Sequence, residues 1–299
     1  MREVGVNPET TILVTGVGGQ VGFELLRSLQ GLGRVVACDR SMLDLSDLDR
    51  VRSVVRELKP TIIVNPAAYT AVDKAETDVD GARRLNADVP RVFAEEAARL
   101  GAALIHYSTD YVFDGTKEGA YVETDATNPQ NVYGLTKLEG EQAIVATECA
   151  HLILRTSWVY GRRGKNFLLT MLKLGSERPE LRVVADQVGA PTWSKTIATA
   201  TSHIVAQATA ADSADWWAQR SGVYHLTSAG ATSWHGFAEA IFANAMGEGA
   251  PKVVPIPASD YPVPAKRPSN SRLSHEKLTE AFGLRLPDWA DALKLCLSE

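Results

Sequence analysis

Residues 11–26 read TILVTGVGGQVGFELL: a short apolar run leads into glycines spaced three apart and then into an apolar, helix-like stretch. A strand that enters a glycine-rich turn and continues as a helix is typical of dinucleotide-binding folds. Gly16 would make the tight turn, Gly19 would allow close approach of a diphosphate, and Gly22 would let the helix pack on the strand. The free N–H groups and positive dipole at the helix start favour an anion. Because no Lys-Ser or Lys-Thr pair follows the glycines, a Walker-type NTPase is excluded.

The strand–helix alternation continues through the first half of the chain. The apolar runs are continuous, as expected for parallel strands covered on both faces; they are Thr11–Thr15, Arg34–Cys38, Thr61–Asn65, Ala102–Ser108 and Leu152–Thr156. Between them, a period of about 3.6 residues predicts helices at Gln20–Gln30, Leu48–Leu58, Val79–Leu100 and Val132–Thr147. Pro90 should kink or split the third helix. This order predicts an α/β fold with a Rossmann-type, doubly wound parallel sheet.

The second half consists mainly of helix-like segments joined by proline-rich stretches, and it predicts a smaller, mostly helical lobe. Helical segments are expected at Asn166–Ser176, Lys195–Gln207, Trp234–Met246, Ser274–Phe282 and Trp289–Leu297. Only Leu181–Ala185 and Val223–Thr227 look like strands, and Val254–Pro268, with five prolines, is expected to be turns. We therefore expect a cofactor-binding domain at 1–160 and a mainly substrate-binding lobe at 161–299, with segments within 183–230 as candidates to return to the first domain.

Composition excludes several classes of protein. The 299 residues include 31 Lys and Arg against 36 Asp and Glu, a net charge of −5, which argues against nucleic-acid and anionic-membrane binding. No apolar stretch reaches the roughly 18–20 residues of a membrane span, and no signal peptide is expected. Three cysteines without a CxxC pair fit a reducing cytoplasm, and the six histidines lack metal-binding spacing.

An acidic residue ends the second apolar run and supports cofactor binding by the glycine-rich turn. A glycine-rich turn alone could be a plain tight turn, but Asp39 stands where a carboxylate accepts hydrogen bonds from the adenosine ribose of NAD. Arg40, beside it, could instead bind the 2′-phosphate of NADP. The sequence therefore predicts NADH or NADPH, with Asp39 tilting the choice slightly toward NADH.

A second set of residues suggests the chemistry. Thr109 ends the fourth apolar run, and ligands of open parallel sheets lie beyond the carboxyl ends of the strands. Tyr133 and Lys137 are four residues apart and so share a helix face. A nearby ammonium favours the phenolate and would lower the pKa of Tyr133 from about 10 toward the range of an acid–base catalyst. A lone Tyr-x-x-x-Lys is common by chance, but the glycine turn and the strand-end hydroxyl make chance a poor explanation.

The chain resembles the extended short-chain dehydrogenase/reductases and, within them, the dTDP-4-dehydrorhamnose reductase family. The resemblance spans essentially the whole chain. The glycine turn and Tyr-x-x-x-Lys are shared by the superfamily, and the longer blocks are specific to the reductase group. The blocks are GVGGQVGFE (16–24), NPAAYTAVDKAE (65–76), HYSTDYVFDG (106–115), NVYGLTKLEG (131–140), RTSWVY (155–160), DQVGAPT (186–192) and RPSNSRL (267–273).

The resemblance implies reduction of the C4 keto group of dTDP-4-dehydro-6-deoxy-L-mannose to dTDP-L-rhamnose by NADH or NADPH. It implies Tyr133 as the proton donor, Lys137 as the residue that holds the nicotinamide ribose and tunes Tyr133, and Thr109 as the hydrogen-bond donor to the C4 carbonyl. Further cofactor positions are Gly19, Gln20 and Val21 at the diphosphate, Asp44 and Leu45 at the adenine, and Ala68, Tyr69 and Thr70 near the substrate; the sugar-side positions are Asp110, Tyr111 and Trp158.

Three further residues are interpreted from their chemistry. Lys266 and Arg267 would suit the substrate diphosphate, since guanidinium groups bind phosphate with two hydrogen bonds, although a solvated turn would also explain them. We expect Asn86 to fasten the third helix to a strand near the site.

One departure from the family concerns a metal. Some relatives dimerise through a magnesium ion held by one acid on the first helix and another shortly after the Gly-x-Pro-Thr motif. Glu24 fills the first position, but Lys195 stands where the second acid would fall. Because a cation opposes metal binding, we predict a monomer or weak dimer that is not bridged by magnesium.

Other functions remain open at this point. They are a reductase of a different dTDP-4-keto sugar, a catalytically silent regulatory homologue, and an epimerase or dehydratase that recycles bound NAD⁺. The silent homologue is disfavoured by the intact set of Thr109, Tyr133 and Lys137. A dehydratase favours an acid beside the catalytic hydroxyl, and Asp110 follows Thr109.

Overall fold

A six-stranded, fully parallel sheet forms the centre of the molecule. The computed structural model describes residues 10–211 and 215–299; residues 1–9, which begin the predicted cofactor domain, lie outside it. The strand order is β2-β1-β3-β4-β5-β10. The strands are β1 (Thr11–Val14), β2 (Arg34–Ala37), β3 (Ile62–Asn65), β4 (Ala103–Thr109), β5 (His151–Thr156) and β10 (Gly222–His225). The predicted doubly wound parallel sheet is confirmed.

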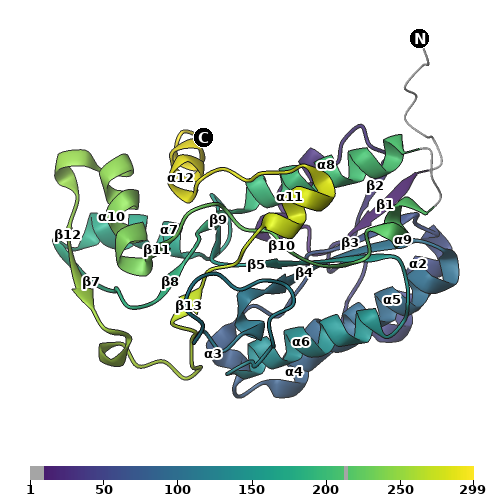
Figure 1. The fold of residues 1–299 in the computed structure, drawn as a ribbon, viewed down its shortest axis with the longest axis horizontal. Coiled ribbons are helices and arrows are strands. Elements are labelled where there is room, and N and C mark those ends of the chain that lie inside the picture. The colour runs from purple at the N-terminus through teal and green to yellow at the C-terminus, as the bar shows by residue number, and fades with distance from the viewer. Residues whose placement is uncertain (1–9, 212–214) are drawn as a thin grey trace, which may run out of the picture.

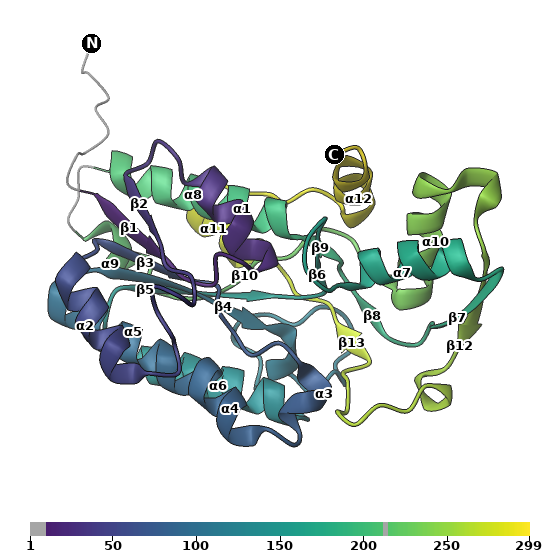
Figure 2. The ribbon, with the colours of Figure 1, turned by 180° about the vertical axis from the view of Figure 1, so that it is seen from behind.

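Helices cover both faces of this sheet, as Figures 1 and 2 show. One face carries α1 (Gln20–Ser28), α8 (Ser194–Ala210) and α11 (Glu276–Phe282). The other carries α2 (Leu48–Leu58), α5 (Val89–Leu100) and α6 (Val132–Val145). The strands are buried on both sides, which explains their continuous apolar runs. Among the described residues, no helix is long and apolar enough to cross a membrane.

The third predicted helix is divided, as Pro90 suggested. α4 (Val79–Arg83) passes through a π-helical turn, Arg84–Asp88, into α5, and Pro90 lies at the start of α5. Proline lacks the N–H that would bond to the Asn86 carbonyl. That carbonyl packs against α6 instead, where a Cβ at Gly140 would lie only 2.1 Å from it. The break therefore lets two helices approach closely behind the site.

The rest of the second half forms a lobe beside the carboxyl ends of the strands, where Figure 1 labels α7, α10, α12, β7 and β12. Its core is packed by α7 (Phe167–Glu177), α10 (Trp234–Ala245) and α12 (Trp289–Leu297) around a two-stranded parallel sheet of β7 (Glu180–Val184) and β12 (Lys252–Ile256). The remaining short elements are α3 (Val72–Ala75), α9 (Trp216–Gln219), β6 (Val159–Tyr160), β8 (Val188–Gly189), β9 (Thr192–Trp193), β11 (Thr232–Ser233) and β13 (Asn270–Ser271).

The prediction that only two strands lie in this half was wrong. The two predicted strands are present as β7 and β10, but β12 takes the first residues of the proline-rich segment that was expected to be turns. β12 pairs only with β7, with Pro255 opposite Val183. A strand with one neighbour tolerates proline because one of its edges needs no N–H donor.

The strand order places the ligand crevice. β1 pairs with β2 on one side and with β3 on the other, so the chain reverses its direction of winding between β1 and β3. Ligands of doubly wound sheets bind beyond the carboxyl ends of the strands at this switch point. The loops after β1, β3 and β4 are therefore the ones that build the site.

Candidate active site

The turn after β1 forms a cradle of backbone atoms. Gly16 adopts φ +56°, and a Cβ at Gly22 would lie 2.2 Å from the Gly16 carbonyl oxygen. The helix α1 starts after Gly19 with no side chain capping its first turn. Free N–H groups at Gln20, Val21 and Gly22 therefore suit a dinucleotide diphosphate. These residues fit a nicotinamide dinucleotide.

The acidic residues of the loop after β2 accept hydrogen bonds from other residues of the same loop. Asp39 Oδ1 accepts hydrogen bonds from Ser41 N (2.9 Å), Ser41 Oγ (2.6 Å) and Met42 N (3.0 Å), and these bonds lower the pKa of Asp39. Asp44 accepts two bonds from Ser46 in the same way. Leu45 packs at the edge of the core under α2. Arg40 is exposed beside them, so this loop presents both acidic side chains and a guanidinium at the surface.

The loop after β3, with Ala68, Tyr69 and Thr70, is held by the π-helical turn. Asn86 Oδ1 accepts the Tyr69 N–H (2.8 Å), and Asn86 Nδ2 donates to the Tyr69 carbonyl (3.2 Å) and to Thr136 Oγ1 on α6 (3.2 Å). Asn86 is fully buried. It thus joins the third helix to this loop and to α6, rather than to a strand as the sequence suggested.

Thr109, Asp110 and Tyr133 lie together at the end of β4. The Thr109 hydroxyl accepts the Tyr111 N–H (3.2 Å) and donates to Asp110 Oδ1 (3.1 Å). Asn131 caps α6 by accepting the Gly134 N–H at 2.8 Å, which fixes Tyr133 in the first turn. The rings of Tyr133 and Tyr111 meet edge to face at 5.5 Å. Two segments distant in the sequence, 109–111 and 131–134, therefore converge.

Burial controls the protonation of these groups. It raises the pKa of Asp110 to about 6, although hydrogen bonds from the hydroxyls of Ser271 and Thr109 lower this pKa in part. It raises the pKa of Tyr133 to about 12, although the Thr109 hydroxyl opposes it. The predicted lowering of this pKa by Lys137 is therefore wrong for this structure, because desolvation of the phenolate outweighs any neighbouring charge. A phenol that keeps its proton at neutral pH suits a proton donor.

Lys137 is almost completely buried, at 1% exposed. Its Nζ donates to the Tyr107 carbonyl at 2.6 Å and lies 3.0 Å from His106 Nε2. Burial lowers the pKa of Lys137 to about 7, and Glu141, one turn along α6, raises it in part. Its protonation is therefore poised near neutrality.

The sugar-side position Trp158 has an unusual backbone and a stacked ring. It adopts φ +47° between β5 and β6, a conformation that costs of order 1–3 kcal/mol outside glycine. Its indole stacks on Trp234 of α10, with centroids 3.6 Å apart and planes 8° apart. Gly189 lies against the same indole, and a Cβ at this position would stand 2.7 Å from the indole Cε2. Such strain at a strand end is typical of a functional position.

Arg267 and Lys266 join the lobe to the sheet half. Arg267 pairs with Asp73 of α3 at 2.8 Å, and Lys266 donates to Gln130 Oε1 at 3.0 Å. Asn131 Nδ2 also donates to the Lys266 carbonyl at 2.7 Å. The structure therefore fastens this segment beside the first turn of α6, near Tyr133.

Several residues at the site were missed by the sequence analysis. They are His106, which contacts Lys137; Asn65, which contacts His106; Trp234, which stacks on Trp158; and Asp73, which pairs with Arg267. HYSTDYVFDG and NPAAYTAVDKAE contain His106, Asn65 and Asp73, but no spacing indicates partners 31 to 194 residues away.

The surroundings of Glu24 contain a cation. Lys195 Nζ donates to the Glu299 carboxylate, and Lys195 also opposes the rise in the pKa of Glu24 that burial and Glu299 cause. Across residues 10–211 and 215–299, no group of three or more His, Cys, Asp or Glu side chains is placed to hold a metal ion.

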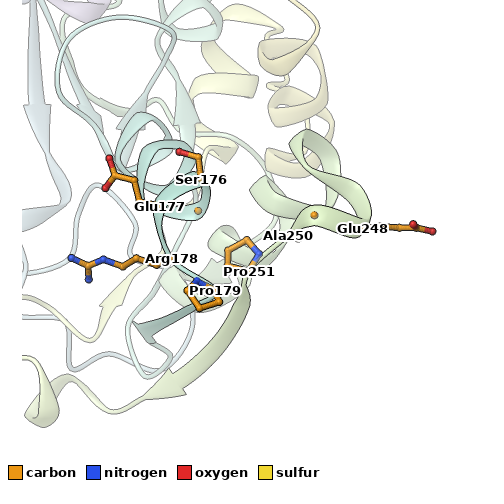
Figure 3. A pocket seen from close by; sticks show the side chains of 9 residues that line it. Ser176, Glu177, Arg178, Pro179, Glu248, Ala250 and Pro251 are labelled. Atoms are coloured by element: carbon orange, nitrogen blue, oxygen red, sulfur yellow. The ribbon is translucent and has the colours of Figure 1, made fainter.

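A surface hollow of about 390 Å³ lies elsewhere, between the end of α7 and the turn before β12 (Figure 3). It is lined by Gly175–Pro179 and Glu248–Pro251, and Glu248 points away from it. None of the predicted site residues lines it. It offers exposed turns rather than converging buried groups, so the strand-end cluster is the better candidate site.

Comparison with known proteins agrees with this geometry. The family described as "RmlD substrate binding domain" matches residues 10–299. A protein of Burkholderia thailandensis named dTDP-4-dehydrorhamnose reductase is 52% identical over 294 residues, covering 96% of this chain and 98% of that protein. The chain belongs to the dTDP-4-dehydrorhamnose reductase family.

Solved structures of the same family share the fold. A dTDP-4-dehydrorhamnose reductase from Clostridium acetobutylicum superposes with a TM-score of 0.89 at 37% identity, covering 97% of this chain and 99% of that chain. One from Bacillus anthracis, solved in complex with NADP, gives 0.89 at 34% identity with the same coverage. The dTDP-4-dehydrorhamnose reductase fold thus extends over both the sheet and the lobe of this chain.

Proposed function

We propose that this chain reduces dTDP-4-dehydro-L-rhamnose to dTDP-L-rhamnose with NADH or NADPH. The observation that carries the proposal is the presence of the buried Thr109 and Lys137 and the half-buried Tyr133 at the carboxyl edge of the sheet, beside a backbone cradle for a dinucleotide. The names of the relatives support the substrate, and the NADP complex of the Bacillus anthracis reductase supports the class of cofactor.

In this proposal the protein supplies the proton and the orientation. The bound nicotinamide supplies hydride to C4 of the sugar. Tyr133, which keeps its proton at neutral pH because it is buried, donates that proton to the C4 oxygen. Thr109 donates a hydrogen bond to the same oxygen, and Lys137 orients the nicotinamide ribose. The hydride from a bound nicotinamide and the proton from Tyr133 would together convert the C4 carbonyl into an alcohol.

The remaining predicted residues have roles in binding. We assign Gly16, Gly19, Gln20, Val21 and Gly22 to the diphosphate of the cofactor. Its adenosine end would meet Asp39, Arg40, Asp44 and Leu45, and its nicotinamide side Ala68, Tyr69 and Thr70. Asp110, Tyr111 and Trp158 would contact the sugar, and Arg267 the substrate diphosphate. Trp158 offers an apolar face and one N–H donor to a deoxysugar, supported by its stacking on Trp234.

The cellular setting and assembly belong to the same proposal. We assign a cofactor domain to 1–160, to which segments within 183–230 return, and a mainly substrate-binding lobe to 161–299; α8 and β10 support this return because they pack on and extend the central sheet. All three cysteines are buried and unpaired, which supports a reducing, cytoplasmic location. The ion pair of Lys195 with Glu299 supports a monomer or weak dimer without bridging magnesium. A dimer in light scattering that EDTA dissociates would contradict this assignment.

The experiment that tests the activity is an assay over a panel of dTDP-4-keto sugars with NADH and with NADPH. Net oxidation of one cofactor per product, with the rhamnose configuration at C4 by NMR, is expected for dTDP-4-dehydro-L-rhamnose. Faster turnover of another keto sugar would reassign the substrate. Product without net cofactor oxidation would indicate an epimerase or dehydratase, and tight binding without any product would indicate a silent homologue.

A further inference from the structure

A row of buried polar groups runs from the first strand to Lys137. Thr15 Oγ1 donates to Asn65 Oδ1 at 2.6 Å, Asn65 Nδ2 lies 3.2 Å from His106 Nδ1, and His106 Nε2 lies 3.0 Å from Lys137 Nζ. Thr15, Asn65 and His106 are completely buried. The row runs from the residue after β1 through the end of β3 and the middle of β4 to α6.

Each link in this row must match a donor with an acceptor, because buried polar groups without partners are costly. An imidazole that is neutral has one N–H and one lone pair. If Asn65 Nδ2 donates to Nδ1, then the His106 proton is on Nε2, and Lys137 must accept it as a neutral amine. If Lys137 is an ammonium, Nε2 must accept, the His106 proton moves to Nδ1, and the Asn65 amide turns over to accept it through Oδ1.

The two arrangements therefore correspond to the two charge states of Lys137. We infer that His106 is a positioning residue for the proposed reduction: by exchanging its tautomer with the Asn65 amide, it stays paired with Lys137 in either charge state and holds the amine toward the site. The inference rests on the proposed function only for its kinetic consequences. The hydrogen-bonded row itself belongs to the free protein.

The charges around the row are consistent with this role. Burial and the nearby Lys137 hold the pKa of His106 well below its usual range, so the imidazole stays neutral and can exchange tautomers rather than charge. Lys137 contacts His106 and the Tyr107 carbonyl on β4, and the carboxylate of Glu141 on α6 acts on its charge. Glu141 is engaged by Arg155 of β5 at 2.6 Å. The imidazole nitrogens of His106 contact the side chains of Asn65 and Lys137.

The hydrogen bonds of Lys137 with the Tyr107 carbonyl and with His106 also fix the direction in which its amine points. An ammonium has three N–H donors. The Tyr107 carbonyl and His106 take two of them, which leaves the third for the cofactor and Tyr133 side. Without the acceptor on His106, a buried ammonium loses a partner and its pKa falls further. Lys137 would then be neutral over more of the working pH range and less firmly oriented.

The first test is spectroscopic and needs no substrate. In the full chain with ¹⁵N-labelled histidine, the ring nitrogens of His106 are followed with pH, and His106→Gln assigns its signals. The expected result is Nδ1–H at low pH and Nε2–H at high pH, with the crossover near the Lys137 pKa of about 7. Lys137→Met should remove the crossover. A single tautomer across this range in the unmodified chain would overturn the inference.

The second test is kinetic and compares two replacements. His106→Gln keeps an acceptor near the position of Nε2, whereas His106→Met fills the space without one. We expect His106→Met to lower kcat roughly 10- to 100-fold, to leave the KM for NADH within about threefold, and to move the alkaline limb of the kcat profile to lower pH. His106→Gln should restore much of kcat and of the profile.

Equal losses in the two variants with an unchanged pH profile would mean that His106 only packs, and would overturn the inference. If His106→Met does not fold, as judged by thermal unfolding, Asn65→Leu takes its place, because it breaks the next link and should move the alkaline limb in the same direction. An unmodified chain that turns over no dTDP-4-keto sugar would defeat the proposed function, while the spectroscopic test would still decide the inference.

Discussion

The two ends of the site are built on opposite physical principles. At the cofactor end, the glycine turn and the loop after β2 are exposed and satisfied locally: Asp39 and Asp44 bond to serines two residues away, and these bonds lower their pKa values. At the chemical end, Asp110 is buried and Tyr133 half-buried, and desolvation raises the pKa values of both. Mutations at the exposed cofactor end should therefore change kinetic constants and stability little, and mutations at the chemical end should change them strongly.

The largest effect is expected from Tyr133→Phe. Removing the proton donor should lower kcat roughly 10²–10⁴-fold while NADH affinity stays nearly constant, because the hydroxyl acts mainly in the transition state. The measurement is steady-state kinetics together with cofactor binding by fluorescence. Tyr107→Phe is the matched control: Tyr107 is also buried, but its hydroxyl bonds to Thr201 at 2.7 Å, so it should affect stability and leave kcat nearly unchanged. Near-normal kcat in Tyr133→Phe would rule out this acid.

The next effect concerns stability and Asp110. The folded protein raises the pKa of Asp110 from 3.8 to about 6, so it favours the protonated carboxyl. Stability from this group is complete below about pH 4 and is lost as pH rises through about 6, a loss of about 3 kcal/mol. Asp110→Asn, which keeps an oxygen for Thr109, should therefore raise the melting temperature near pH 8 and not below about pH 4.

Asp114 supplies the control of opposite sign. It accepts bonds from Thr116, Tyr121 and Asn128, and these bonds lower its pKa well below the usual range. Its stability contribution is present above about pH 4 and is lost as pH falls further. Asp114→Asn should therefore lower the melting temperature near pH 8. Thermal unfolding that shifts both variants in the same direction would contradict the contrast between buried and locally bonded acids.

A smaller effect is expected from Trp234→Ala. Trp234 supports the indole of Trp158 by stacking, an interaction of about 0.5–1.5 kcal/mol. Its loss should raise the KM for the sugar nucleotide by roughly 3- to 10-fold and leave the KM for NADH unchanged. Trp217→Ala, on α9, packs against Trp216 instead and should change neither. An equal rise in both KM values for Trp234→Ala would remove Trp158 from the sugar side.

The smallest effect is expected at the exposed cofactor end. Arg40→Ala should raise the KM for NADPH by less than about tenfold, since exposed charge pairs contribute little, and should leave the KM for NADH unchanged. Arg34→Ala, at the opposite end of β2, is the control. Parallel changes with the two cofactors would show that Arg40 does not distinguish them.

Features that depend on residues close in the sequence could be predicted, and features that depend on contacts between distant residues could not. The glycine turn, Asp39, Thr109 and the Tyr133–Lys137 pair are local patterns, and the alternation of strands and helices indicates a doubly wound parallel sheet, so the fold class and the main candidates could be identified. The pairings of His106 with Lys137, Asp73 with Arg267 and Trp158 with Trp234 arise only when the chain folds. The high pKa of Tyr133 was also inaccessible, because it depends on burial. β12 was missed because its prolines suggested turns.

The most direct test of the account is a single turnover of dTDP-4-dehydro-L-rhamnose with NADH that carries deuterium at the transferable position of its nicotinamide C4. The account predicts dTDP-L-rhamnose with deuterium at C4 of the sugar and one NADH oxidised per product. Deuterium at another sugar carbon, or product formed without net oxidation of NADH, would contradict it.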